Sequence, residues 1–246
     1  MVKLGISNVD KKKVAVKIVT RNGLSQDDEE SLRAEVKILT ALNYPNIVRA
    51  FDFFEEEKFF YVVLEYLDGG ELFDRIVKKT FYNEKEARDL VVIILRAIKY
   101  LHDMDVIHRD LKPENLIMTS KEDDANVKIA DFGFAVKCNG CNITTQCGTP
   151  GYIAPEIIET KAYGKPVDMW SFGVILYILL GGYPPFHDDN QRILFKKITK
   201  ADYQFHPDYW RTVSDEAKDL IAGLLTLDMH KRLTVDQALS HPWVKA

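Results

Sequence analysis

The sequence predicts an α+β protein with two lobes, a small β-rich N-lobe followed by a larger helical C-lobe. Up to residue 65, short apolar segments rich in β-branched and aromatic residues alternate with polar turns, which is typical of strands. After Asp68-Gly69-Gly70, apolar residues recur at three- and four-residue spacing, which is typical of helices. We expect one domain over 1–246, with the N-lobe at 1–65, the C-lobe at 66–246 and a ligand between them.

The N-lobe is predicted to contain four strands and one helix. Two strands are expected at Val2–Ile6 and Val14–Val19, and a hairpin with an EEEK turn at Ile47–Phe54 and Phe59–Leu64. Between them, Gln26–Leu42 carries apolar residues at helical spacing, and a proline follows shortly after its end. The N-lobe is therefore expected to be a small sheet with a single helix.

The C-lobe is predicted to be built around two long helices. Glu84–Met104 has an apolar stripe, and residues 166–181 are apolar on nearly all sides, which is typical of a buried central helix. Further helices are expected near 190–199, 214–226 and 234–239.

Composition and charge exclude several classes of protein. The 246 residues are 46% hydrophobic and 28% charged, as in an ordinary globular domain, and the net charge is −4. Nucleic-acid binding usually needs a basic surface, and no apolar run is long enough to cross a bilayer. We expect neither nucleic acid nor membrane as a partner. Three cysteines favour a reducing compartment, so we expect the cytoplasm and, in addition, the nucleus.

Polar residues gather in two short segments between buried elements. The loop HRDLKPEN (108–115) places Asp110, Lys112 and Asn115 within six residues, and apolar residues flank it on both sides. Asp131-Phe132-Gly133 follows a short apolar strand. Two acids and an amide near one point would suit Mg²⁺, which prefers oxygen ligands and shares them with phosphates.

Lys17 is a charged residue inside the apolar segment VAVKIV (14–19). A charge in such a strand is costly unless something pairs with it. The sequence therefore predicts a partner for Lys17. The alternative is a side chain that extends along the surface into solvent.

These motifs resemble those of the eukaryotic protein kinases. VAVK (14–17), HRDLKPEN, DFG (131–133) and APE (154–156) occur in the order found in that family, and the similarity covers nearly the whole chain. Four motifs in register are highly specific. The resemblance implies the bilobal protein-kinase fold, ATP and Mg²⁺ as cofactors, and transfer of the ATP γ-phosphate to a protein hydroxyl.

The resemblance also implies roles for individual residues. Lys17 is similar to the lysine that contacts the α- and β-phosphates, and Glu35 to its ion-pair partner. Asp110 is similar to the residue that orients the substrate hydroxyl and accepts its proton, and Lys112 to the one that neutralises the transferred phosphoryl group. The alternative for Glu35 is an ordinary surface position on a helix.

Further positions resemble the nucleotide site of the family. Asn115 and Asp131 are similar to its magnesium ligands. The backbone of Glu65 and Leu67 would hydrogen-bond adenine. Apolar side chains would line the adenine pocket, namely those of Val2, Ala15, Leu64 and Ile117.

The substrate class is implied by the same resemblance. Lys112 and GTPGY (148–152) are typical of serine/threonine kinases. Glu71 is similar to a glutamate that contacts ribose and a basic residue three positions before the phosphoacceptor, so we expect protein substrates with Arg or Lys upstream. The alternative is that Glu71 only stabilises a helix N-terminus.

Other residues of these motifs are expected to be structural. They are Asp168 as an anchor beneath the catalytic loop, His108 as a core residue, Thr149 as a hydrogen-bond partner near Asp110 and Lys112, and the ion pair Glu156–Arg232.

The segment between DFG and APE is expected to be regulatory. Thr145 lies where the family carries its activating phosphate, with Thr144 as the second choice. A phosphate there, added by an upstream kinase, would pair with Arg109 and also with Lys137. The alternative is that no phosphorylation is needed.

The same segment contains Cys138 and Cys141, with Cys147 nearby. A C-x-x-C pair can be half of a zinc site or a redox pair. No histidine is placed to complete a zinc site, so the preferred interpretation is two incidental cysteines.

Several segments are similar to the calcium/calmodulin-dependent kinases, among them YPNIV, GGELFDRI, CGTPGYIAPE, YILLGGYPPF and HPWV. Calmodulin binding would need a helix after the domain, so we expect calmodulin as a partner only if such a segment exists.

The family places a glycine-rich loop, G-x-G-x-x-G-x-V, ahead of the lysine strand. Val2, fifteen residues before Lys17, fits the valine that closes this motif, so the glycines would precede Met1. We expect the chain to lack the first strand and this loop, and to bind ATP weakly. The alternative function is a catalytically weak or inactive kinase-like interaction module.

Overall fold

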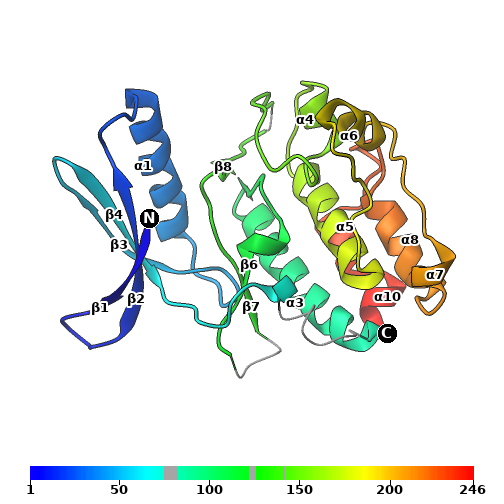
Figure 1. The fold of residues 1–246 in the computed structure, drawn as a ribbon, viewed down its shortest axis with the longest axis horizontal. Helices are drawn as coiled ribbons and strands as arrows, with labels where there is room; N and C mark the ends of the chain where they lie inside the picture. The colour runs from blue at the N-terminus through cyan, green and yellow to red at the C-terminus, as the bar shows by residue number, and fades with distance from the viewer. Residues whose placement is uncertain (75–82, 122–125, 141) are drawn as a thin grey trace.

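The computed structural model describes residues 1–74, 83–121, 126–140 and 142–246. A sheet formed by the first 65 residues lies beside a larger helical part, as Figure 1 shows. This arrangement confirms the expected α+β fold with a β-rich N-lobe and a helical C-lobe. Among the described residues, no helix has both the length and the apolar character needed to cross a membrane.

The N-lobe sheet has four antiparallel strands in the order β1-β2-β4-β3. They are β1 (Val2–Ile6), β2 (Lys13–Thr20), β3 (Ala50–Glu55) and β4 (Phe59–Glu65). In this register Val2, Lys17 and Val62 are opposite one another, and so are Leu4, Ala15 and Leu64. Opposite residues share a face of the sheet, so Lys17 lies on the same face as the residues expected to line the adenine site.

The strands agree with the prediction except at the start of β3, which was expected at Ile47. Ile47 and Val48 are buried, but Val48 donates its amide hydrogen to the Ile129 carbonyl, and Ile129 donates to Asn46. This segment therefore pairs with the C-lobe. The strand around Lys17 is also half-buried, whereas the sequence predicted a buried one.

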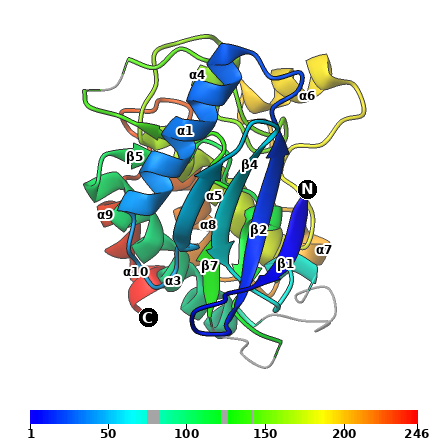
Figure 2. The same cartoon turned by 90° about the vertical axis from the view of Figure 1, so that its left-hand side faces the viewer.

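The N-lobe helix α1 (Gln26–Ala41) lies against one face of the sheet, as Figure 2 shows. It begins at a capping box, in which the Ser25 hydroxyl accepts from the Asp28 amide and the Asp28 carboxylate accepts from the Ser25 amide. It buries an apolar stripe together with Glu35. Burial of a carboxylate on this face calls for a cationic partner.

The C-lobe is organised around α3 (Glu84–Asp103) and α5 (Pro166–Gly181), both expected from the sequence. Nearly every residue of α5 is buried, which confirms its central position. The expected shorter helices are present as α6 (Gln191–Ile198), α8 (Asp215–Leu224) and α9 (Val235–Leu239).

Three single-turn helices in the described part of the chain were not predicted. They are α4 (Pro155–Ile158), α7 (Pro207–Trp210) and α10 (Pro242–Lys245). Each begins with a proline, whose fixed φ and missing amide hydrogen suit the first position of a helix.

Two small antiparallel sheets hold the loops that carry the polar motifs. Strand β5 (Val106–Ile107) pairs with β8 (Val136–Lys137), and β6 (Leu116–Met118) pairs with β7 (Val127–Ile129). A 3₁₀ turn, Pro113–Asn115, leads into β6. The loop 108–115 and the DFG segment are therefore attached to paired strands.

The expected ion pair between Glu156 and Arg232 is confirmed. The Arg232 Nη1 and Nη2 atoms lie 2.7 and 2.9 Å from the two Glu156 carboxylate oxygens, and the side chains are 0% and 4% exposed. Removing one member of a buried pair leaves the other charge uncompensated.

We therefore expect Arg232→Ala to lower the free energy of unfolding by about 3–5 kcal/mol, measured by urea denaturation. Lys218→Ala, which removes an ion pair to the exposed Asp215, is the control and should cost less than about 1 kcal/mol. Equal losses in the two variants would contradict the prediction.

Candidate active site

Asp168, in the first turn of α5, anchors the loop 108–115, which we call the catalytic loop. Its fully buried carboxylate accepts from the backbone amides of His108 (3.0 Å) and Arg109 (2.9 Å), and lies 3.0 Å from His102 Nε2. Burial opposes ionisation, but the hydrogen bonds from the His102 side chain and the His108 backbone amide favour the carboxylate, and the pKa of Asp168 is lowered. The expected anchoring role of Asp168 is confirmed, whereas the contact of His102 was not predicted.

His108 is a core residue, as expected. Its Nε2 lies 3.1 Å from the Ala130 carbonyl oxygen, its Nδ1 accepts from the Asp110 amide, and its ring meets the edge of Phe132. Desolvation by complete burial is the main effect on this ring and lowers the pKa of His108. His108 therefore links the catalytic loop to the DFG segment as a neutral residue.

The Asp110 carboxylate is held by two neighbouring side chains. Thr149 Oγ1 donates to Asp110 Oδ1 at 2.7 Å, Lys112 Nζ lies 2.8 Å from Asp110 Oδ2, and Lys112 also donates to Thr149 at 2.9 Å. The expected hydrogen bonds of Thr149 are thus confirmed. Gly148 has φ +108°, and a Cβ there would lie 2.9 Å from the Arg109 carbonyl oxygen, so glycine permits this close approach.

Lys17 is paired with an acid on α1. Its Nζ lies 2.9 Å from Glu35 Oε1 and 3.9 Å from Asp131 Oδ1. The Lys17 and Glu35 side chains are 28% and 11% exposed, so the lysine does not extend freely into solvent. One cation from β2 thereby contacts acids from α1 and from the segment after β7.

The pairing of β6 with β7 brings Asn115 near Asp131, because the Ala130 amide donates to the Asn115 carbonyl at 2.9 Å. The Asn115 side-chain amide group donates to the Asp110 carbonyl, which leaves its Oδ1 as the atom able to bind a cation. Asp131 has φ 56°, and its carboxylate is about half exposed. An amide oxygen and a carboxylate fit Mg²⁺, which takes further oxygens from phosphates and water.

The residues expected to line the adenine pocket come from four strands, three in the N-lobe sheet and β6 in the C-lobe. Ala15 and Leu64 are opposite each other in the β2–β4 pair and are half-buried. Val2 lies on the same face of the sheet at the edge strand and is 65% exposed. Ile117 in β6, also half-buried, forms a bridge with Glu71.

The segment between the lobes is fixed on both sides. The Glu65 amide donates to the Arg49 carbonyl at 2.8 Å, so this amide already has a partner within the protein. The Glu65 side chain pairs with Lys128 of β7 at 2.8 Å, a contact between the lobes that was not predicted. Leu67 follows and is half-buried.

Thr145 is exposed and is connected to Arg109 through Tyr163. The Tyr163 hydroxyl donates to the Thr145 carbonyl at 2.7 Å and accepts from Arg109 Nη1 at 3.0 Å. Thr144 is also exposed. Lys137 instead donates to the Met104 carbonyl, so the structure does not bring it toward Thr145. No sequence signal pointed to Tyr163.

The structure contradicts the interpretation of Cys138 as an incidental cysteine. Cys138 is buried and disulfide-bonded, so it is not incidental. Cys147 is free and half-buried, with its Sγ 3.8 Å from the Tyr163 hydroxyl oxygen. Cys141 is outside the described residues. Among the residues that are described, no group of three or more His, Cys, Asp or Glu side chains could hold a metal ion.

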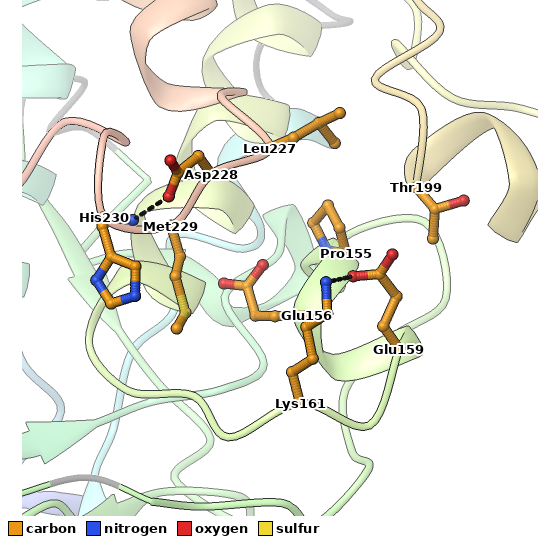
Figure 3. A pocket seen from close by; sticks show the side chains of 9 residues that line it. All are labelled: Pro155, Glu156, Glu159, Lys161, Thr199, Leu227, Asp228, Met229 and His230. Atoms are coloured by element: carbon orange, nitrogen blue, oxygen red, sulfur yellow. Dashed lines mark hydrogen bonds and ion pairs between the residues drawn. The ribbon is translucent and has the colours of Figure 1, made fainter.

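A cavity of about 480 Å³ lies elsewhere, between α4, the end of α6 and the turn after Leu227, as Figure 3 shows. Its charged residues are already paired, since Glu156 binds Arg232 and Glu159 lies 2.6 Å from Lys161. It contains none of the residues expected to act on ATP. The candidate active site is therefore the cluster around Lys17, Asp110 and Asp131.

The protein kinase domain family matches residues 1–244, and the chain belongs to this family. The chain is 48% identical over 231 residues to calcium/calmodulin-dependent protein kinase type 1 of Macrobrachium nipponense, covering 94% of this chain and 67% of that protein. The protein of the same name from Caenorhabditis elegans is 48% identical over 230 residues, which cover 94% of this chain and 66% of the relative. Myosin light chain kinase A of Dictyostelium discoideum is 46% identical over 248 residues, 100% of this chain and 84% of that protein.

These comparisons confirm the expected family, the resemblance to calcium/calmodulin-dependent kinases and the enzyme class, an ATP-dependent serine/threonine protein kinase. The chain spans about two thirds of the length of the type 1 relatives.

Burial of His108 predicts a pH dependence of stability. Because its pKa is lowered in the folded state, the unfolded chain takes up a proton first as the pH falls below about 6.5. Stability should then decrease by up to about 1.4 kcal/mol per pH unit until the folded pKa is reached.

We expect His108→Phe to flatten this slope in urea denaturation between pH 7 and pH 5.5. His187→Phe, a change at an exposed histidine, is the matched control. The prediction is wrong if the wild type and His108→Phe lose stability in parallel.

Proposed function

We propose that this domain transfers the γ-phosphate of ATP to serine or threonine hydroxyls of proteins with basic residues upstream. The observation that carries the proposal is the Asp110 carboxylate, which Lys112 and Thr149 hold on a loop anchored by Asp168. A carboxylate fixed in this way can orient a hydroxyl, and a lysine beside it can neutralise developing negative charge.

In the proposed reaction, the substrate hydroxyl oxygen forms a bond to the γ-phosphorus while the bond from that phosphorus to the ADP oxygen breaks. Asp110 accepts the hydroxyl proton, and Lys112 neutralises charge on the transferred group. Lys17 holds the α- and β-phosphates, and Glu35 keeps Lys17 in place. Asn115 and Asp131 would hold Mg²⁺, which supplies positive charge to the phosphates.

The preference for basic substrates is supported by the environment of Glu71. Partial burial raises the pKa of Glu71, and the neighbouring charges of Asp74 and Glu114 raise it further. Three acids that repel one another are stabilised by a cation, so an Arg or Lys side chain upstream of the phosphoacceptor would bind here. Glu114 was not singled out from the sequence.

Regulation is proposed at Thr145. Its exposure and its connection to Arg109 through Tyr163 support a phosphate at this position, because a phosphate could then pair with the guanidinium. The names of the type 1 relatives, calcium/calmodulin-dependent protein kinases, also support control of this domain by calcium and calmodulin.

Transfer is tested with labelled ATP, Mg²⁺ and a serine peptide that has arginine three residues before the serine. We expect transfer by the wild type and a loss of at least about 100-fold in Asp131→Ala. Asp215→Ala, at an exposed acid of α8, is the control and should retain the wild-type rate. No transfer by the wild type, with retained partner binding, would favour the interaction-module alternative.

Substrate preference is tested with Glu71→Gln. We expect KM for the arginine peptide to rise about tenfold, or about 1.4 kcal/mol, while KM for a peptide with alanine in place of that arginine is unchanged. Glu57→Gln, at an exposed acid in the β3–β4 turn, is the control. An equal rise for both peptides would show that Glu71 does not recognise the arginine.

A further inference from the structure

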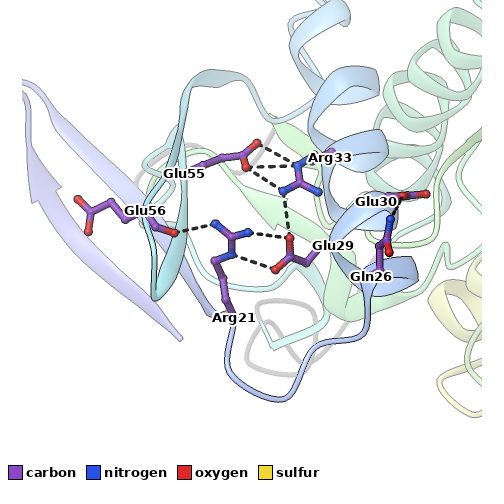
Figure 4. A network of polar contacts seen from close by, with 7 residues as sticks. All are labelled: Arg21, Gln26, Glu29, Glu30, Arg33, Glu55 and Glu56. Carbon is purple, nitrogen blue, oxygen red and sulfur yellow. Dashed lines mark hydrogen bonds and ion pairs between the residues drawn. The ribbon is translucent and has the colours of Figure 1, made fainter.

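Four charged side chains connect α1 to the sheet, as Figure 4 shows. We call them the α1 clamp: Arg21, which follows β2, Glu29 and Arg33 on α1, and Glu55 at the end of β3. Arg21 donates to both Glu29 carboxylate oxygens at 2.9 and 2.8 Å. Arg33 donates to Glu29 at 3.0 Å and to the two Glu55 oxygens at 3.0 and 2.9 Å.

The two guanidinium groups of the clamp also lie near one buried ring. The central carbons of Arg21 and Arg33 are 4.5 and 5.3 Å from the centre of the Phe60 ring, which is fully buried in β4. Arg21 donates in addition to the Glu56 carbonyl at 2.9 Å. Planar, bidentate contacts combined with ring contacts suit arginine and are not reproduced by lysine.

The clamp acts on the helix that carries Glu35. At about 100° per residue, Glu29 and Arg33 lie at one edge of the buried stripe of α1, and Glu35 lies within this stripe. A rotation of α1 about its own axis would therefore break the clamp and move Glu35 relative to Lys17. None of the hydrogen bonds of the clamp described above joins it to Lys17 or to a loop of the C-lobe.

Both acids of the clamp are stabilised as carboxylates. The Arg21 hydrogen bond is the main reason that the pKa of Glu29 is lowered, and the Arg33 hydrogen bond the main reason that the pKa of Glu55 is lowered. The clamp is thus a network of four charges near neutral pH. Such networks can hold a geometry where an isolated surface pair contributes little.

We propose that Arg21 and Arg33 are positioning residues for phosphoryl transfer, because they fix the orientation of α1 and so keep Glu35 within reach of Lys17. This inference rests on the proposed roles of Lys17 and Glu35. Its effect is exerted through Glu35, so it should disappear when Glu35 can no longer pair with Lys17.

The first test compares Arg33→Ala with the wild type. We expect the dissociation constant for MgATP, measured by calorimetry, and the KM for ATP both to rise about three- to tenfold. Lys99→Ala is the matched control, since Lys99 also pairs with two carboxylates and its side chain is 37% exposed, against 38% for Arg33. This control should leave both constants unchanged.

A charge exchange separates the clamp from a general loss of stability. The double variant Arg33→Glu with Glu55→Arg can restore the link between α1 and β3, so it should recover more ATP affinity than Arg33→Glu alone. Arg21→Lys should bind ATP more weakly than the wild type does, because lysine cannot make the bidentate contact. Thermal unfolding of each variant verifies that it is folded.

The decisive test is a cycle with Glu35→Gln. If the clamp acts through Glu35, Arg33→Ala should change ATP affinity less than about twofold in the Glu35→Gln background. Equal effects of Arg33→Ala in both backgrounds would overturn the inference, and so would an equal effect of Lys99→Ala. Because affinity is measured without turnover, a wild type that binds ATP but does not transfer phosphate contradicts the proposed function and still tests the clamp.

Discussion

The ion pair between Lys17 and Glu35 is the interaction on which the arrangement of the N-lobe depends. A lysine in a half-buried strand needs a partner, and the partner comes from a helix that buries its carboxylate against the same sheet. Lys17 also lies 3.9 Å from Asp131, which belongs to the other lobe. Lys17 thus brings β2, α1 and the DFG segment together. The position of its partner Glu35 depends on the orientation of α1.

A buried acid has the corresponding role in the C-lobe. Asp168 on the central helix accepts two backbone amide hydrogens from the catalytic loop, and this fixes the chain just before Asp110. Arg109 has φ 67°, an uncommon conformation for a residue other than glycine, and it is held there by these contacts. Buried charges of this kind add little net stability, but they can specify one conformation of a polar loop. Glu35 and Asp168 thus fix the two charged groups of the site, the Lys17 cation in the N-lobe and the Asp110 carboxylate in the C-lobe.

Much of this could be predicted from the sequence, because α1 and α5 have long periodic patterns and the motifs around Asp110 and Asp131 are dense and ordered. The start of β3 could not, because Ile47 and Val48 look like strand residues and pair instead with a segment about 80 positions away. The link from Thr145 through Tyr163 to Arg109 and the contacts of Arg21 with Glu29 depend on tertiary packing, which leaves no local pattern. The short helices that begin at Pro155, Pro207 and Pro242 do have a local sequence signal, which is the proline at the first helical position.

Phosphate transfer by a Lys17→Met variant, with Lys13→Met as its control, tests most directly whether the Lys17 cation organises the site. Lys13 lies on the same strand and the same face of the sheet, four residues away, and is exposed. With labelled ATP, Mg²⁺ and a basic serine peptide, we expect Lys13→Met to retain the wild-type rate and Lys17→Met to lose at least about 100-fold. Equal rates for the two folded variants would contradict this account of the site.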